Sequence, residues 1–294
     1  LTDQQSSKML GCAGNRYVNT PNLDQLAAKG VRFEKCACAN PVCVPSRFSL
    51  FTGMLPETIG VRCNEDAREI TRVSEEILEN GLGHLLRNAG YDTYYGGKEH
   101  LPTFRAKDVG FTYFCKDERN ELARESARFL MQDRENPFAL VVSFINPHDI
   151  CYMAIDNYKH PPLENPSMFQ KLWRRLKTRA WYGRKELTTL HKCHPCLTNG
   201  DNSEKLPPLP ENHQPQEDEP EAVRSLFKRT FRKHARDSWS EETWRIHRYV
   251  YAKLTERVDE QIGTVLNGLE HGPHAENTVV IFTSDHGDHD GSHK

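Results

Sequence analysis

The chain has 294 residues, of which 37% are hydrophobic, and its formal net charge at pH 7 is -2. This length allows one large core or two modest ones, and the near-neutral charge gives no overall bias toward nucleic acid or membranes. No apolar run approaches the length of a membrane span, and the nine cysteines are an odd number without a regular framework, so they do not establish an oxidising compartment.

The pattern of apolar residues predicts helices that alternate with short buried strands. Residues 1–5 are expected to be the frayed end of a strand, with polar residues emerging at its tip. Apolar residues at helical spacing predict helices over 20–30, 45–52, 77–89, 118–131 and 244–269. Short apolar runs predict strands over 31–33, 91–95, 138–145 and 278–282. This alternation indicates an α/β fold in which helices cover both faces of a central mixed, mostly parallel sheet.

Polar residues with chemical capability follow several of the predicted strands. In α/β folds the functional site lies at the carboxyl ends of the strands. The residues that fall at such ends are Asp3, Lys98, His100, His148, Asp285 and His286. Together with Cys43 they converge on one rim of the predicted sheet, which indicates a functional site there.

A cysteine, a proline and an arginine stand close together in the run Cys-Val-Pro-Ser-Arg at 43–47. Pro45 suits the first position of a helix and Gly53 its left-handed stop, so Cys43 should lie just ahead of a short helix. The N–H groups at the start of that helix favour anions, and the guanidinium of Arg47 suits a tetrahedral oxyanion. The run therefore predicts a nucleophile at an anion site, with a buried structural cysteine as the alternative.

Three of the residues at strand ends form a set of ligands suited to a divalent cation. Hard oxygen donors from Asp3 and Asp285 suit calcium or magnesium, and the imidazole of His286 extends the choice to manganese. The alternative for the Asp-His pair is an ordinary polar loop.

Two further positions could carry acid, base or anion-binding side chains. Lys98 and His100 alternate at the end of a predicted strand, so both can face one pocket if the backbone turns there. Gly96 and Gly97 permit such a turn, and the alternative is a solvated loop. His148 follows a buried strand and could serve as a general acid near neutral pH, or it could simply cap that element.

The stretch 151–237 differs from the rest of the chain because it is rich in proline and charge, and we interpret it as an insertion or lid. Cys193 and Cys196 have zinc-like spacing, but no second pair follows, so a disulfide or free thiols are the alternative. Basic residues with interleaved aromatics over 171–185 and 224–236 could contact a polyanion, or they could be solvated faces of amphipathic helices.

Five motifs cover nearly the whole chain in an order that one known family shares. They are the lead-in at 20–33, Cys-Val-Pro-Ser-Arg at 43–47, Gly-Lys-Glu-His-Leu at 97–101, Asn-Pro-His at 146–148 and Thr-Ser-Asp-His-Gly at 283–287. With these motifs the chain resembles the formylglycine-dependent sulfatases of the alkaline phosphatase superfamily, which carry C-x-P-S-R and G-K-x-H-L. The resemblance implies an alkaline phosphatase-like fold and the hydrolysis of sulfate esters, either of a sulfated carbohydrate or of a small organic sulfate.

The resemblance also implies a modification, a metal ion and roles for individual residues. A formylglycine-generating maturation enzyme would oxidise Cys43, and the hydrated aldehyde would attack sulfur in line. The ligands of one divalent cation, calcium in most of the family with magnesium or manganese as alternatives, would be Asp3, Gln4, the modified Cys43, Asp285 and His286. Arg47 would stabilise the hydrate and Lys98 would bind the sulfate oxygens. His148 would assist the leaving oxygen, and His100 would assist the release of sulfate.

The sequence departs from the family pattern at two metal positions. Asp3 is followed by Gln4 where many members have a second acid, and His286 stands where many sulfatases have asparagine. Because the Asp-His pair also occurs in phosphonate monoester hydrolases, a phosphonate monoester or phosphodiester hydrolase on the same scaffold is the second hypothesis. A non-catalytic polyanion-binding protein that uses the two basic runs is the third.

Residues 1–294 are expected to form a single sulfatase-like catalytic domain, truncated at both ends, with 151–237 as an insertion within it. The chain begins at Leu1 without a methionine, so we expect a leader to be absent from it. Comparison with the family pattern leads us to expect that the start of the first strand, a second catalytic lysine and the C-terminal subdomain are absent as well. Such a fragment is expected to be inactive or poorly folded. Family analogy indicates a periplasmic or secreted protein, and the sequence leaves the sulfate ester and the oligomeric state open.

Overall fold

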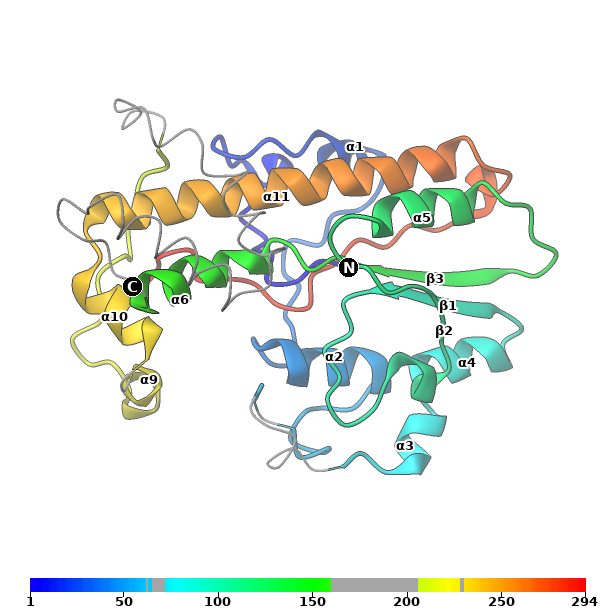
Figure 1. The fold of residues 1–294 in the computed structure, drawn as a ribbon, viewed down its shortest axis with the longest axis horizontal. Helices are drawn as coiled ribbons and strands as arrows, with labels where there is room; N and C mark the ends of the chain where they lie inside the picture. Colours follow the sequence, from blue (N-terminus) through cyan, green and yellow to red (C-terminus); the bar gives the residue numbers. More distant parts are fainter. Residues whose placement is uncertain (62, 65–71, 160–205, 228–229) are drawn as a thin grey trace, which may run out of the picture. The chain divides into compact units, whose positions relative to one another are not determined.

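Figure 1 shows the computed structural model, which describes residues 1–61, 63–64, 72–159, 206–227 and 230–294. The chain divides into two compact units. The first comprises Leu1–Asn15, Thr20–Pro147 and Arg257–Asp288, and the second comprises Arg16–Asn19, His148–Glu256 and His289–Lys294. Every site residue predicted from the sequence lies in the first unit, with the exception of His148.

A three-stranded parallel sheet lies within the first unit. Its strands are β1 (Asp92–Gly97), β2 (Thr112–Cys115) and β3 (Phe138–Ser143), in the order β2-β1-β3. The pairing of β1 with β3 is unbroken, whereas the register of β1 with β2 shifts between Tyr95 and Gly96. Consecutive strands that run parallel need a crossover connection, and helix α5 (Leu122–Leu130) lies in the connection from β2 to β3, the two strands on either side of β1. The predicted α/β fold is confirmed.

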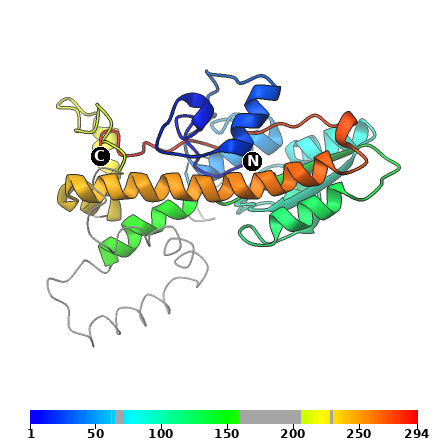
Figure 2. The same cartoon turned by 90° about the horizontal axis from the view of Figure 1, so that it is seen from above.

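Helices cover both faces of this sheet (Figure 1). Besides α5, the first unit contains α1 (Pro21–Lys29), α2 (Cys43–Thr52), α3 (Glu75–Glu79), α4 (Leu82–Asn88), the second half of α11 (Glu241–Glu270) and the short η1 (Gly11–Ala13), η2 (Ala106–Val109) and η6 (Ala275–Asn277). Tyr95 and Val141 pack with α2 and α4, whereas Tyr94 and Leu140 pack with α5 and α11. Successive strand residues point to opposite faces, so each strand serves two apolar cores. Helix α5 lies beside the second half of α11 in both views (Figure 1 and Figure 2).

The start of the chain is held between two other segments of the first unit. The amino group of Leu1 donates to the carbonyl of Val142 in β3 at 2.9 Å. On the opposite side the N–H of Thr2 donates to Thr283 O at 3.0 Å, and the N–H of Asp285 donates to Thr2 O at 3.1 Å. The start of the chain therefore runs parallel to its neighbours, as expected for the end of a strand, and meets a segment more than 280 residues further on.

Two of the predicted strands are wrong. Residues 31–33 and 278–282 are extended segments without a ladder partner among the described residues. Most of their apolar side chains are exposed rather than buried, among them Phe33 by 79%, Val279 by 87% and Ile281 by 82%. An apolar, β-branched run becomes a strand only where a neighbouring strand completes its hydrogen bonds, and the pattern of a single segment does not report that neighbour.

The single helix predicted over 77–89 is also wrong, because the structure has α3 and α4 there instead. The break falls at Gly81, where an added Cβ would stand 2.6 Å from Cβ of Val109 in η2. Ser74 caps α3 by accepting the N–H of Ile77 at 3.4 Å. The close approach of η2, which lies elsewhere in the sequence, ends the first helix where the apolar spacing alone would continue it.

Two helix starts differ from the prediction. Helix α2 begins at Cys43 rather than at Pro45, so the cysteine is the first helical residue, and Gly53 ends this helix at φ 70° as expected. Helix α5 begins at Leu122 rather than at residue 118. The reason is that Asp117 Oδ1 accepts N–H bonds, at 2.5 to 3.0 Å, from Arg119, Asn120 and Glu121. A side chain that satisfies these donors holds the preceding turn out of the helix.

The described part of the second unit is helical. Its elements are η3 (His148–Ile150), α6 (Cys151–Lys159), α9 (Glu221–Leu226), α10 (Phe231–Ser238) and the first half of α11. Trp239 and Trp244 form its apolar centre with Ala235, and their ring centroids are 4.8 Å apart. The insertion predicted at 151–237 falls in this unit, and its stretch 160–205 lies outside the described residues. Within the described parts of the chain, no helix combines the length and the hydrophobicity that a membrane span requires.

Candidate active site

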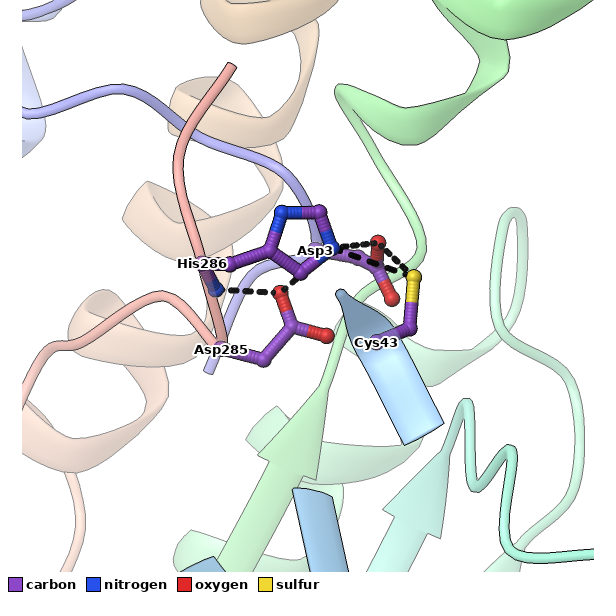
Figure 3. Close-up of side chains that lie close together, drawn as sticks. All are labelled: Asp3, Cys43, Asp285 and His286. Atoms are coloured by element: carbon purple, nitrogen blue, oxygen red, sulfur yellow. Dashed lines mark hydrogen bonds and ion pairs between the residues drawn. The ribbon is translucent and has the colours of Figure 1, made fainter. Parts of the chain in front are cut away.

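Four buried side chains meet at the carboxyl end of the sheet. They are Asp3, Cys43, Asp285 and His286 (Figure 3). Their ligand atoms, two carboxylate oxygens, one sulfur and one imidazole nitrogen, all lie within 4.8 Å of one another. Figure 3 shows the four side chains pointing toward one another from the start of the chain, from α2 and from the segment around residue 285. The backbone pairing of residue 2 with residues 283 and 285 is what brings the first and last of these segments together.

The thiol of Cys43 lies in the first turn of α2, in the middle of this cluster. Its Sγ is 3.1 Å from Nε2 of His286 and 3.4 Å from Oδ1 of Asp3, to which it donates. Burial raises the pKa of the Cys43 thiol to about 12, with Asp3 adding to the shift and Lys98 opposing it. The thiol is therefore protonated at neutral pH, and a protonated thiol is a poor nucleophile.

The imidazole of His286 is held in one tautomer. Its Nδ1 lies 2.7 Å from the carbonyl oxygen of Gly287. Because a carbonyl only accepts, Nδ1 carries a proton, and in the neutral imidazole the lone pair of Nε2 is then directed at the cluster. Nε2 is 3.9 Å from a carboxylate oxygen of Asp3 and 3.9 Å from one of Asp285. This is the tautomer in which a histidine binds a metal ion.

Two cations hold the two carboxylates of the cluster. Arg47 is fully buried on α2, one turn after Cys43, so the two side chains share a face of the helix. Its Nε donates to Oδ2 of Asp285 at 2.7 Å, and its Nη2 donates to Oδ2 of Asp3 at 3.1 Å. The ammonium of Lys98 also donates to Asp3. The two acidic groups of the cluster are therefore each in contact with at least one cationic side chain.

Burial and charge act against each other on these groups. Burial raises the pKa of Asp285, although the guanidinium of Arg47 opposes that shift. Burial alone would lower the pKa of Arg47, but Asp285 and Asp3 more than offset it, so its pKa rises. Arg47 consequently stays charged at every accessible pH and is a permanent cation of the site.

Lys98 and His100 follow β1 in a tight turn. Gly97 has φ 91° and His100 has φ 50°, both in the left-handed region. Desolvation lowers the pKa of His100 to about 4, and the charges of Lys98 and Arg47 act on it in the same direction while Asp3 acts against them. His100 remains exposed on one side, yet the surrounding chain displaces enough water to favour its neutral form. The turn thus brings both residues to the cluster.

The donor set fits a divalent cation. Asp3 and Asp285 supply hard oxygen donors, and His286 supplies the lone pair of Nε2. All three side chains are buried, and two carboxylates in such surroundings gain from a nearby positive charge. Oxygen donors suit calcium or magnesium, and a single imidazole among them also admits manganese.

Gln4 and His148 were predicted for the site but are not among the four residues of the cluster. The side-chain amide of Gln4 donates from Nε2 to Oδ2 of Asp288 at 2.5 Å, while its backbone N–H donates to Oδ1 of Asp285 at 3.1 Å. Asp288 therefore orients Gln4, whose assignment as a metal ligand stays a prediction. His148 is the first residue of η3 in the second unit, and its assignment as general acid also stays a prediction.

Asn64 belongs to the surroundings of the cluster, although no motif indicated it. Its Oδ1 accepts the backbone N–H of Val44 at 2.8 Å, and its side chain slightly opposes the rise in the pKa of the Cys43 thiol. It satisfies one of the N–H groups at the start of α2 that no helical carbonyl can reach. No local pattern marks such a residue, because its partner lies 20 positions earlier in the chain.

Ser143 and Tyr95 hold the guanidinium and the turn after β1. Nη1 of Arg47 donates to Oγ of Ser143 at 3.0 Å and to the carbonyl of Lys98 at 2.9 Å. The hydroxyl of Tyr95 donates to the same carbonyl. Ser143 is the last residue of β3, so the rule that polar residues at strand ends serve the site would have indicated it.

The remaining candidates lie away from this cluster in the sequence. Cys193, Cys196 and the basic run at 171–185 lie outside the described residues. In the other basic run, Arg236 forms an ion pair with Glu219 at 2.9 Å. That arginine is half-buried, so it contributes to the packing of the second unit as well as to its charge.

Comparison with known proteins identifies the family. The sulfatase family model matches residues 1–294. The chain is 25% identical over 310 residues to the delta 4,5-hexuronate-2-O-sulfatase of Bacteroides thetaiotaomicron, covering 99% of this chain and 56% of that protein. A solved 2-O GAG sulfatase superposes with a TM-score of 0.74 at 23% identity, over 100% of this chain and 58% of the other. The phosphonate monoester hydrolase of Agrobacterium radiobacter superposes with a TM-score of 0.59 at 21% identity, over 99% and 62%.

The chain spans a little more than half the length of the curated relative. The two superpositions confirm the expected alkaline phosphatase-like α/β fold. The family model covers every motif that the sequence shares with formylglycine-dependent sulfatases, from the lead-in at residue 20 to the Asp-His pair at 285. The chain belongs to the sulfatase family.

Proposed function

We propose that the protein hydrolyses sulfate esters through a formylglycine hydrate derived from Cys43, with one divalent cation bound beside it. The observation that carries this proposal is the convergence of Cys43 Sγ, two carboxylates and an imidazole lone pair within 4.8 Å. Membership of the sulfatase family supports the reaction class. Calcium is the proposed ion, with magnesium or manganese as alternatives.

The proposed modification agrees with the chemistry of residue 43. An unmodified thiol with a pKa of about 12 is not suited to attack an ester at neutral pH. A hydrated aldehyde at the same position would present hydroxyl groups to Asp3 Oδ1 and His286 Nε2, the acceptors that now lie around Sγ. The second hydroxyl allows release of sulfate by re-formation of the aldehyde, so no stable ester on the enzyme needs hydrolysis. A formylglycine-generating enzyme is the partner that this proposal requires.

The charges of the site match those of the reaction. Cleavage of a sulfate ester develops negative charge on the sulfate oxygens and on the departing alcohol oxygen. Lys98 is proposed to bind the sulfate oxygens, and Arg47 to hold the nucleophilic hydroxyl of residue 43. A bound cation would supply Lewis-acid stabilisation of that charge. His148 is proposed to protonate the alcohol, and the neutral His100 to take a proton while sulfate leaves.

The proposed substrate is a sulfated carbohydrate or a small organic sulfate. The names of the two similar proteins, a hexuronate-2-O-sulfatase and a 2-O GAG sulfatase, support the carbohydrate class. A second candidate is the hydrolysis of phosphonate monoesters or phosphodiesters. The Asp285-His286 pair and the structural likeness to the phosphonate monoester hydrolase support it.

Mass spectrometry of the peptide that contains residue 43 tests the modification. The protein should be co-expressed with a formylglycine-generating enzyme, and a Cys43→Ala variant serves as the control. We expect the parent peptide to carry formylglycine and the parent protein to release sulfate, while the variant does neither. An unmodified thiol at residue 43, together with no release of sulfate from aryl or sugar sulfates, would contradict the proposal.

Kinetics on one preparation separate the two substrate classes. A panel should contain sugar sulfates of defined position, an aryl sulfate, a phosphodiester and a phosphonate monoester. The sulfatase proposal expects the highest kcat/KM on a sulfate, and a higher value on the phosphodiester or phosphonate would favour the alternative.

A further inference from the structure

Glu99 stands between Lys98 and His100 in the turn after β1, and none of the roles above uses it. Its side chain is 14% exposed, and its carboxylate accepts two hydrogen bonds and forms one ion pair. The hydrogen-bond donors are the backbone N–H of Ala106 at 2.5 Å and the hydroxyl of Tyr113, and the ion pair joins Nε of Arg105 to the carboxylate at 3.0 Å. These three contacts fix the position of a largely buried carboxylate.

The donors belong to a different part of the chain from the turn that they hold. Ala106 begins η2, and Tyr113 lies on β2. Burial, together with the hydrogen bond to Glu99, raises the pKa of Tyr113 to about 12, so the phenol remains a donor throughout the neutral range. Its hydrogen bond to Arg105, aided by Glu99, raises the pKa of that arginine. The three side chains therefore form one charge-assisted network.

The turn itself is in a conformation that needs external support. His100 has φ 50°, in the left-handed region that residues with a Cβ adopt at a cost in free energy. Such a residue keeps that conformation only where surrounding contacts impose it. On one side the turn is held by Arg47, whose Nη1 donates to the carbonyl of Lys98 at 2.9 Å. The carboxylate of Glu99 supplies the contacts on the other side.

We propose that Glu99 is a positioning residue for the reaction. Its carboxylate anchors the turn to η2 and β2 and thereby sets where Lys98 and His100 present their side chains to the substrate. This inference rests on the sulfate ester hydrolysis proposed above. Glu99 acts through its neighbours and not on the substrate, because its two hydrogen-bond donors and its ion-pair partner belong to η2, β2 and the residue before η2.

Three variants of the formylglycine-containing protein test the inference: Glu99→Ala, Glu99→Gln and Tyr113→Phe. We expect Glu99→Ala to lower kcat/KM on an aryl sulfate by about 10-fold to 100-fold, chiefly through kcat, because small misplacements of reacting groups have effects of this size. Glu99→Gln keeps an acceptor oxygen and should recover part of the loss. Tyr113→Phe removes one hydrogen-bond donor to Glu99, and it should lower kcat/KM by a smaller factor than Glu99→Ala. Glu125→Gln, which removes a carboxylate from a surface ion pair on α5, is the matched control and should equal the parent.

A double-mutant cycle separates positioning from plain stability. Glu99→Ala should lower kcat/KM by a smaller factor in the His100→Ala background than in the parent, because the part of its effect that acts through His100 is already lost. Additive losses, or a Glu99→Ala variant with parental kcat and KM and only a lower Tm, would overturn the inference. The dissociation constant of inorganic sulfate gives a readout that needs no turnover, and Glu99→Ala should raise it through Lys98. An inactive parent contradicts the proposed function, whereas an active parent matched by Glu99→Ala contradicts this inference alone.

Discussion

The buried thiol of Cys43 leads to a prediction about its reactivity before maturation. Its pKa is raised to about 12, so very little thiolate exists at pH 8, and only the thiolate is alkylated. In protein made without a maturation enzyme, iodoacetamide should modify the exposed Cys36 at least about 100-fold faster than Cys43. Peptide mass spectrometry over a time course measures both rates in one sample. Equal rates at pH 8 would show that the site activates the thiol, and the need for formylglycine would lose its physical support.

His100 predicts how stability depends on pH. Its folded pKa is about 4, below the ordinary value of 6.5, so between these values the unfolded chain binds more protons than the folded protein. Stability should therefore fall as the pH drops from 6.5 to 4, and His100→Gln should make this dependence shallower by less than one proton. Urea unfolding of the metal-free protein at pH 4.5, 5.5 and 6.5 measures the slope. If the free energy of unfolding depends on pH with the same slope in the parent and in the variant, the desolvation of His100 is contradicted.

At the scale of elements, the break between α3 and α4 predicts the sign of a glycine substitution. In one continuous helix, Gly81→Ala would stabilise the protein by about 1 kcal/mol. In the observed fold the new Cβ would lie 2.6 Å from Val109, so we expect a loss of about 1–3 kcal/mol. The midpoint of urea unfolding distinguishes the two signs. Glu79→Ala, at the exposed end of α3, is the control for propensity alone, and a stabilised Gly81→Ala protein would rule out the close contact with η2.

The sequence predicted correctly those elements whose start, end or apolar face is determined by residues within the element or next to it. The glycine that ends α2 and the apolar face of α11 are local features, and the structure has both. Long-range contacts decided the others. Gly81 meets Val109, and the run 278–282 has no ladder partner in the described chain. Neither contact is visible in the segment that it affects, so periodicity alone predicted one continuous helix where the structure has two and a buried strand where the structure has none.

At the scale of the whole molecule, the rule that polar residues at strand ends serve the site predicts most of this cluster from the sequence alone. Asp3, Lys98 and Asp285 each follow an extended segment, and parallel segments deliver their carboxyl ends to one edge. The rule holds at Asp285 even though 278–282 is not a strand, because the backbone of Thr2 pairs directly with the residues around it. It does not indicate Asn64, whose contact with α2 comes from a loop without periodicity.

The assembly of the site from the two ends of the first unit predicts how a cation affects those ends. Asp3 and Asp285 lie on segments joined by the N–H of Thr2 and the N–H of Asp285, so an ion shared by the carboxylates should lock both hydrogen bonds together. At about a hundredfold excess of calcium over its Kd, linkage stabilises the bound form by about 2.7 kcal/mol. The amide hydrogens of Thr2 and Asp285 exchange with solvent when this region opens locally. Where that opening requires calcium to dissociate, their exchange should be about 100-fold slower with calcium than without it. Hydrogen exchange with and without calcium measures it.

The matched pair of variants for this prediction is Asp285→Asn and Asp92→Asn. The first removes a ligand from the cluster, and the second makes the same chemical change at the exposed start of β1. Asp285→Asn should abolish the calcium-dependent protection of Thr2, whereas Asp92→Asn should leave it unchanged. Because Thr2 belongs to the opposite end of the chain from the substituted residue, loss of its protection would report coupling of the two ends through the ion. Protection of Thr2 that survives in Asp285→Asn would place the cation elsewhere, and the proposed ligand set would then be wrong.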